Sequence, residues 1–124
     1  MKNTNLIITS ILGALAIILG AFGAHALKEK LGVDALNSFE TGVRYQMYHV
    51  IVLLFVNTYL EFSSKTKNTI SWLFFIGILF FSGSLYAITA GGINPKLIWF
   101  VTPLGGLLFI IGWVLMSINF IKNK

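Results

Sequence analysis

Four long runs of apolar residues constrain the fold of this chain more than any other feature. They cover residues 6–27, 43–60, 69–90 and 97–118, and each has roughly the length that an α-helix needs to cross the hydrocarbon core of a bilayer. Hydrophobic residues make up 56% of the 124, and a domain of this size could not hide so much apolar surface from water. The sequence therefore predicts one integral membrane domain over residues 1–124, folded as an all-α, four-helix transmembrane bundle.

The links between these runs predict how the helices connect. Most are short, which favours antiparallel helical hairpins. The link before the second run is longer, and within it Leu36, Phe39 and Val43 recur at helical spacing. We expect a short interfacial helix there, with Asp34 as its N-cap, which continues or bends at Gly42 into the second span.

The first run has some features of a secretory signal peptide, because Ala24, His25 and Ala26 imitate an A-x-A cleavage site. Its apolar region is longer than the usual signal core of about 7–15 residues. We therefore expect this segment to be retained as a transmembrane helix.

The basic residues indicate an orientation. The formal charge is +5, but the basic residues stand singly or in pairs beside apolar runs, which argues against a nucleic-acid surface. Four spans place both termini on one side, and cytoplasmic flanks carry an excess of lysine and arginine. The slight excess favours a multi-pass protein of the plasma membrane with N-in and C-in termini. The terminal side would hold Lys2, Lys65, Lys67, Lys122 and Lys124, and the other side Lys28, Lys30, Arg44 and Lys96.

Small residues on the first run share one helical face. Such a stripe lets another helix approach closely, although glycine and alanine are also simply common in membrane helices. A glycine pair on the fourth run has the same character. The candidate packing residues are Gly13, Ala16, Gly20, Gly23, Ala24, Gly105 and Gly106.

Antiparallel spans bring the conspicuous polar residues into one half of the bundle. The end of the first span, the start of the second, the end of the third and the start of the fourth lie at one membrane face. We expect Gln46 and His49 to turn inward toward hydroxyl groups of the third span, because lipid offers no replacement hydrogen bonds. The candidate cluster is His25, Gln46, His49, Ser82, Ser84 and Tyr86.

This polar cluster has two interpretations. It could be a small pocket that binds a lipid headgroup, a solute or a proton, or it could be interhelical hydrogen bonding that specifies packing. Beside it, Glu40 and Arg44 lie four residues apart. We expect them to form an interfacial ion pair while the arginine stem snorkels.

Signals of enzymatic chemistry are absent or weak. The chain has no cysteine, no Walker loop and no dinucleotide fingerprint, and we expect no cofactor. The Ser-Gly-Ser of residues 82–84 is not a nucleophile elbow. His25, His49, Asp34 and Glu40 lack the spacing of metal ligands, and no metal site is predicted.

Short motifs follow one another along nearly the whole chain. They are GAFGAHALK at 20–28, TGVRYQMYH at 41–49, FSGSLY at 81–86, TPLGG at 102–106 and GW at 112–113. In this order they resemble the transmembrane protein 256 family, small membrane proteins placed in a domain-of-unknown-function class. The resemblance implies four spans and an uncleaved first segment, and it implies no particular activity.

We expect a non-enzymatic, multi-span membrane protein whose polar half-bundle binds a lipid headgroup, a small solute or a partner helix. One alternative is a subunit of an oligomeric channel or transporter for small solutes. Another is a membrane enzyme with His49 as general base near Ser82 or Tyr86. The expected partners are the lipid bilayer and either a second copy of the chain or a partner membrane protein.

Overall fold

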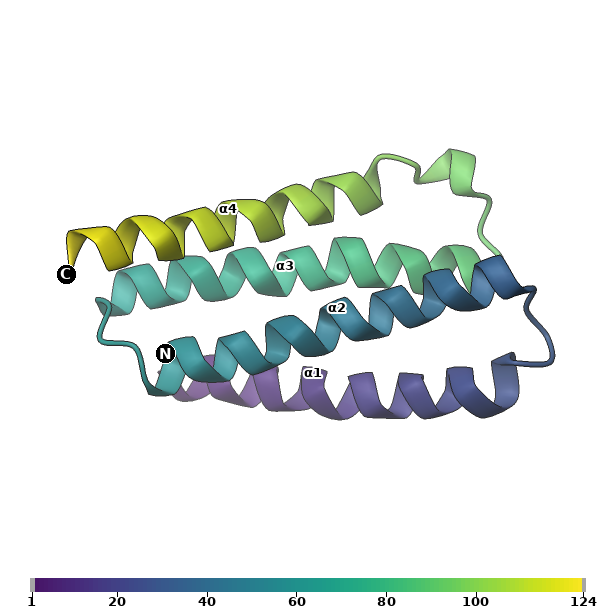
Figure 1. Cartoon of the computed structure of the whole chain (residues 1–124), viewed down its shortest axis with the longest axis horizontal. Coiled ribbons are helices and arrows are strands. Elements are labelled where there is room, and N and C mark those ends of the chain that lie inside the picture. Colours follow the sequence, from purple (N-terminus) through teal and green to yellow (C-terminus); the bar gives the residue numbers. More distant parts are fainter. Residues whose placement is uncertain (1, 124) are drawn as a thin grey trace.

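The computed structural model of the chain describes residues 2–123, and within that range every regular element is helical. The chain has four long helices in this range. They run alternately in opposite directions, so that both termini lie at the same end of the bundle (Figure 1). The predicted all-α class and the antiparallel hairpins are therefore confirmed. The elements are α1 (Lys2–Phe22), a π-helical turn (Gly23–Leu27), α2 (Val33–Thr58), α3 (Ser64–Thr89), a 3₁₀ turn (Pro95–Leu97) and α4 (Val101–Lys122).

Local sequence signals explain where these helices begin and end. Ser63 caps α3, because its Oγ accepts a hydrogen bond from the backbone N–H of Thr66 at 3.1 Å. After α3 the chain turns at Gly92, whose φ of 70° suits glycine and few other residues. Pro103 lies in the first turn of α4, where its missing N–H does no harm.

The segment expected to lead into the second span continues into it without a break and forms no separate short helix, because α2 is one continuous helix from Val33 to Thr58. Its N-cap is Gly32, and Asp34 lies inside the first turn instead of capping it. Gly42 lies within this helix and does not end it. A Cβ built there would lie 2.9 Å from the ring of Tyr86, so the glycine serves close packing between α2 and α3. This packing holds the first turns of α2 against the bundle.

The helices pack in chain order, as a row instead of a closed ring. α1 lies mainly against α2 and touches α3 only slightly, whereas α4 packs chiefly on α3. Figure 1 shows α1 and α4 at opposite edges of this row. α1, at one edge of the row, is therefore packed against one neighbour along most of its length.

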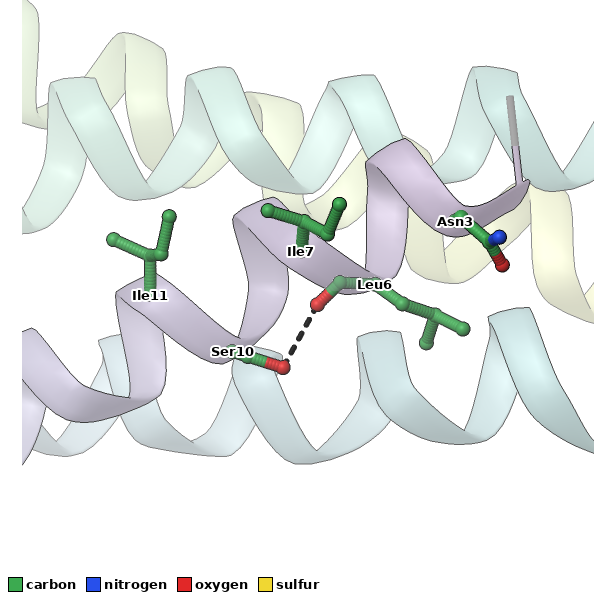
Figure 2. A pocket seen from close by; sticks show the side chains of 5 residues that line it. All are labelled: Asn3, Leu6, Ile7, Ser10 and Ile11. Carbon is green, nitrogen blue, oxygen red and sulfur yellow. Dashed lines mark hydrogen bonds between the residues drawn. The ribbon is translucent and has the colours of Figure 1, made fainter.

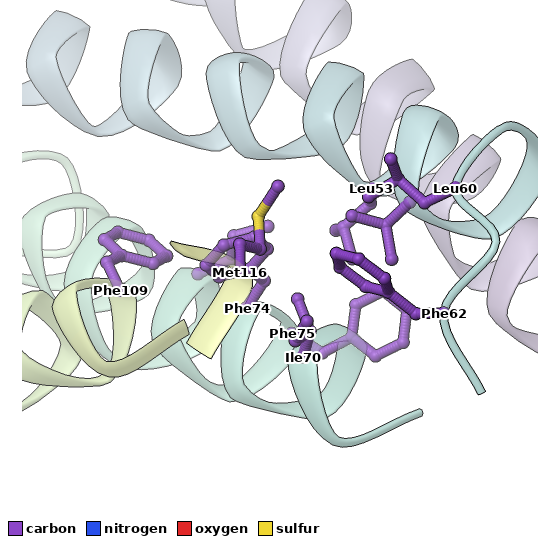
Figure 3. Packing of buried hydrophobic residues seen from close by; sticks show 10 residues of the cluster. Leu53, Leu60, Phe62, Ile70, Phe74, Phe75, Phe109 and Met116 are labelled. Carbon is purple, nitrogen blue, oxygen red and sulfur yellow. The ribbon is translucent and has the colours of Figure 1, made fainter. Parts of the chain in front are cut away.

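The hydrophobic core lies among the last three helices. Figure 3 shows its aromatic and aliphatic side chains pointing toward one another from α2, α3, α4 and the α2–α3 link. α1 contributes only partly buried side chains at its margin. The core residues are Leu53, Val56, Leu60, Phe62, Ile70, Phe74, Phe75, Ile78, Phe109 and Met116.

Three helical segments are long and apolar enough to cross a membrane: Asn3–Leu27, Ser64–Thr89 and Val101–Lys122. α2 has the same length as α3 but carries Arg44, Gln46 and His49, which lower its hydropathy. Large apolar side chains are exposed on all four helices, as expected when lipid is the solvent. The structure is that of a multi-span membrane protein.

Candidate functional site

Gln46 joins three helices near the middle of the bundle. It is 2% exposed. Its Nε2 donates to the carbonyl oxygen of Leu12 on α1 at 2.7 Å, and its Oε1 accepts a hydrogen bond from the Tyr86 hydroxyl on α3 at 2.7 Å. The sequence predicted this inward turn and the tyrosine partner, and did not predict the bond to the backbone of α1.

The two serines of the predicted cluster face different helices. Ser82 Oγ donates to the carbonyl oxygen of Gly42 on α2 at 2.6 Å. Ser84 turns the other way and shares a short hydrogen bond with the Thr102 hydroxyl on α4. Because they lie two residues apart on a helix, their side chains point to well-separated faces.

His49 is enclosed by aromatic residues of α3 and α4. Its Nδ1 lies 2.7 Å from the carbonyl oxygen of Tyr45, and its Nε2 lies 3.1 Å from Trp113 Nε1. A carbonyl only accepts and an indole N–H only donates, so Nδ1 carries the proton and Nε2 accepts. The ring of Phe109 stacks on the imidazole at 3.8 Å and the ring of Phe74 meets its edge at 4.9 Å. Both nitrogens of the neutral ring are thereby engaged.

The residues of the predicted cluster therefore do not form one site, because they bond to different helices. Gln46 meets Tyr86, and Ser82 bonds to Gly42 on the same α2–α3 face. His49 and Ser84 each pair with α4 instead. His25 is exposed in the π-helical turn and joins none of these hydrogen bonds.

The predicted pair of Glu40 and Arg44 is not formed. The Arg44 guanidinium instead donates to the Thr41 hydroxyl at 3.1 Å, one turn toward the start of α2. Within residues 2–123 no ion pair joins Arg44 to a carboxylate. An exposed pair of this kind contributes about 0–1 kcal/mol, so a competing hydroxyl on the same helix is enough to redirect the side chain.

Most of the small stripe on α1 lies against α2. A Cβ at Gly13 would meet Val50 at 3.2 Å, and one at Gly23 would meet the Phe39 ring at 2.9 Å. The remaining members differ in position: Ala16 is 1% exposed and Gly20 has room for an ordinary contact, whereas Ala24 is exposed.

At Gly105 the backbones of α3 and α4 lie very close together. A Cβ at Gly105 would overlap the backbone of Phe81, with the Phe81 Cα at 2.8 Å. At Gly106 the nearest atom is 3.8 Å away, which is ordinary contact. Gly77 and Gly112 also receive aromatic rings, from Phe109 and Phe74 respectively. Neither glycine was predicted as a packing residue, because a lone glycine in a membrane helix is common.

A second buried polar group lies at the opposite end of the bundle, near the termini. Asn5 Nδ2 donates to Asn57 Oδ1 at 3.1 Å and to Asn68 Oδ1 at 2.8 Å, which joins α1, α2 and α3. Asn57 Nδ2 donates in turn to Ser71 Oγ at 2.9 Å. Asn5 is fully buried, and its Oδ1 accepts no hydrogen bond from any residue in the described range 2–123. This carboxamide cluster was missed, although the topology argument applied to the other end would have found it.

Two apolar grooves flank α1. The groove toward α3 has a volume of about 230 Å³ and has Gln46 and Tyr86 among its lining residues. The groove toward α2 is larger, about 480 Å³, and Arg44 lies at its edge. Its remaining lining residues are Ala16, Ile17, Gly20, Ala21, Val43, Met47 and Tyr48.

A third hollow lies on the outer face of α1 (Figure 2). All its lining residues come from the first turns of that one helix, and Ser10 is hydrogen-bonded to the Leu6 carbonyl at 2.8 Å. It is a surface depression between side chains that face outward. We assign no chemistry to it.

The described residues contain no group of three or more histidine, cysteine, aspartate or glutamate side chains that could hold a metal ion. The buried polar atoms are carboxamides, hydroxyls and one neutral imidazole, which form hydrogen bonds without net charge. Arg44 is the charged side chain that lines the larger groove beside α1. The arrangement can join helices and hold an amphiphilic molecule.

Comparison with known proteins places the chain among small membrane proteins. Residues 19–106 match the model of the family described as protein of unknown function DUF423. A UPF0382 membrane protein of Staphylococcus saprophyticus is 44% identical over 116 residues, covering 90% of this chain and 95% of that protein. One of Haemophilus influenzae is 41% identical over 126 residues, covering 100% and 98%.

The name of a third relative also gives the membrane in which that relative lies. The UPF0382 inner membrane protein YgdD of Escherichia coli is 32% identical over 126 residues, covering 96% of this chain and 90% of that protein. No solved structure matches the chain. The coarser part of the family resemblance, membership in a class of membrane proteins of unknown function, is thereby confirmed. The chain belongs to the DUF423 family of UPF0382 membrane proteins.

Proposed function

We propose that all four helices cross the plasma membrane and that both termini lie in the cytoplasm. α2 lies between α1 and α3 and packs against both, which supports the proposal that it shares their membrane depth. Its Gln46 and His49 are buried against protein, so the low hydropathy of α2 does not require contact between these groups and lipid. The lysine-rich flanks on the terminal side support the orientation. We also propose that the family is related to the transmembrane protein 256 family.

We propose further that the protein binds a membrane lipid in the grooves beside α1 and performs no catalysis. One observation carries this proposal: α1 is held mainly by α2 and has an apolar groove on either side. Each groove also meets a polar group, Gln46 with Tyr86 on one side and Arg44 on the other. Apolar walls with a few polar groups are typical of sites for amphiphilic ligands.

The state of His49 supports a non-catalytic role. A general base needs a free nitrogen within reach of the proton that it removes. Nδ1 already donates to a backbone carbonyl and Nε2 already accepts from Trp113. The channel alternative is less well supported, because the buried polar groups bond to one another within one chain instead of lining an axis between copies.

The test is native mass spectrometry of the full chain released from membranes. Wild type should retain bound phospholipid. Gly83→Leu should reduce retention in the groove toward α3, since Gly83 lines that groove and a side chain there has room to enter it. Leu107→Phe, on the exposed face of α4, is the control and should leave retention unchanged. A wild-type chain that retains no phospholipid would overturn the proposal.

A further inference from the structure

Arg44 has an unusual position for a charged residue. It is exposed on α2 at the level of Gly20 of α1, since Gly20 faces the neighbouring Val43. Gly20 is seven residues before Leu27, the last residue of the π-helical turn that follows α1, so this level is about 10 Å inside the end of that helical segment. A charged side chain at such a depth is expensive and marks a functional site by default.

No carboxylate within the described residues neutralises this charge. The guanidinium donates one hydrogen bond to Thr41, which lies one turn nearer the end of the bundle. This direction matches snorkelling toward the headgroup region. The four acidic residues of the chain therefore leave Arg44 available for an anion from outside the protein.

The groove beside Arg44 provides the apolar part of a site. Its volume of about 480 Å³ lies within the range of about 300–1,000 Å³ that ligand pockets have. Small residues on α1, namely Ala16, Gly20 and Ala21, form one wall, and Met47 and Tyr48 of α2 form part of the other. Of the described residues that line it, Arg44 alone is charged. An apolar groove with a cation at its rim has the shape and charge of an anionic amphiphile.

We propose that this groove binds an anionic phospholipid, with an acyl chain along the small residues of α1 and the phosphate at Arg44. This inference rests on the proposed function and names the lipid class that the larger groove selects. Arginine suits this role better than lysine, because its planar guanidinium group can bind two phosphate oxygens at once. The hydrogen bond to the Thr41 hydroxyl holds the guanidinium group on the headgroup side.

The experiment measures headgroup preference in the full chain. The protein is reconstituted into vesicles of equal parts phosphatidylglycerol and phosphatidylcholine, and bound lipids are identified by native mass spectrometry. Wild type should favour phosphatidylglycerol about five-fold, the factor that one basic residue gives near an anionic lipid. Arg44→Gln should bring the ratio near one, and Arg44→Lys should give an intermediate ratio.

Matched variants separate the effect of the Arg44 charge from the effects of groove shape and of misfolding. Lys96→Gln removes an exposed cation at the same end of the bundle, outside the groove, and should keep the wild-type ratio. Ala21→Phe fills the groove without a change of charge and should lower binding of both lipids there. Helix content by circular dichroism reports whether each variant folds.

Three results would overturn this inference alone. The first is equal retention of both lipids by wild type, which leaves the proposed function standing. The second is an unchanged preference in folded Arg44→Gln. The third is displacement of the lipid by inorganic phosphate, which would indicate a phosphate site. Retention of neither lipid would overturn the proposed function and this inference together.

Discussion

Replacing His49 with leucine should weaken the attachment of α4 to α2. The substitution removes the hydrogen bond from Trp113 Nε1 at 3.1 Å and the stack on Phe109 at 3.8 Å. An interhelical hydrogen bond in a membrane contributes about 0.6–1.7 kcal/mol, and an aromatic pair about 0.5–1.5 kcal/mol. Leucine restores part of the packing, so we expect a loss of about 1–2 kcal/mol.

A double-mutant cycle isolates the hydrogen bond from the lost packing. The free energy of unfolding in mixed micelles is measured for His49→Leu, Trp113→Phe and the double variant. Because each single change breaks the same bond, the two effects should be non-additive by about 1 kcal/mol. The structure predicts that most of this coupling is the bond between Nε1 and Nε2.

Trp72 provides the matched control. It is 45% exposed and Trp113 is 44% exposed, but Trp72 packs edge-on against Phe75 on the same helix. His49→Leu combined with Trp72→Phe should be additive within about 0.3–0.5 kcal/mol. Additive effects of the His49 and Trp113 changes, or equal coupling of His49 with Trp72, would show that the hydrogen bond from Trp113 to His49 does not stabilise the bundle.

Three further changes test other contacts. Gly105→Ala should destabilise the bundle by about 3 kcal/mol, because its methyl group meets the backbone of Phe81, whereas Gly106→Ala should be near neutral in the same unfolding assay. Asn57→Leu should lower stability by about 1–3 kcal/mol by leaving the buried Asn5 with one partner fewer, and equal stability would contradict that role. Intact-mass measurement should find the first helix retained, because its buried groups bond to α2 and α3; a cleaved product would contradict this.

Much of the fold follows from the length and spacing of the apolar runs. They predicted four antiparallel helices joined by links, and the structure has four long helices in that arrangement (Figure 1). The start of α2 was harder, because an amphipathic helix on the membrane surface and the first turns of a packed helix have the same periodicity. Only the contact of Gly42 with α3 distinguishes them, and that contact is tertiary.

The partners of the buried polar groups were only partly predictable. Helical spacing placed Gln46 and His49 on the interior of α2, and Gln46 does meet Tyr86. The spacing could not tell which neighbour lies opposite each residue, so His49 was assigned to α3 when it bonds to Trp113 of α4. Asn5 and Asn57 were not predicted to meet, although they lie at similar depths near the terminal end of the bundle. A comparison of the depths of polar residues along the antiparallel helices, made at both ends of the bundle, predicts that Asn5 and Asn57 meet.

Labelling of single cysteines measures whether α2 crosses the membrane with the other helices. The chain has no cysteine of its own, so Lys30→Cys, Glu61→Cys and Ile93→Cys each give one label site, in the three successive links. A thiol reagent that cannot cross membranes should label positions 30 and 93 from outside the cell and position 61 only after the membrane is opened. Labelling of positions 30 and 61 from the same side would contradict the account.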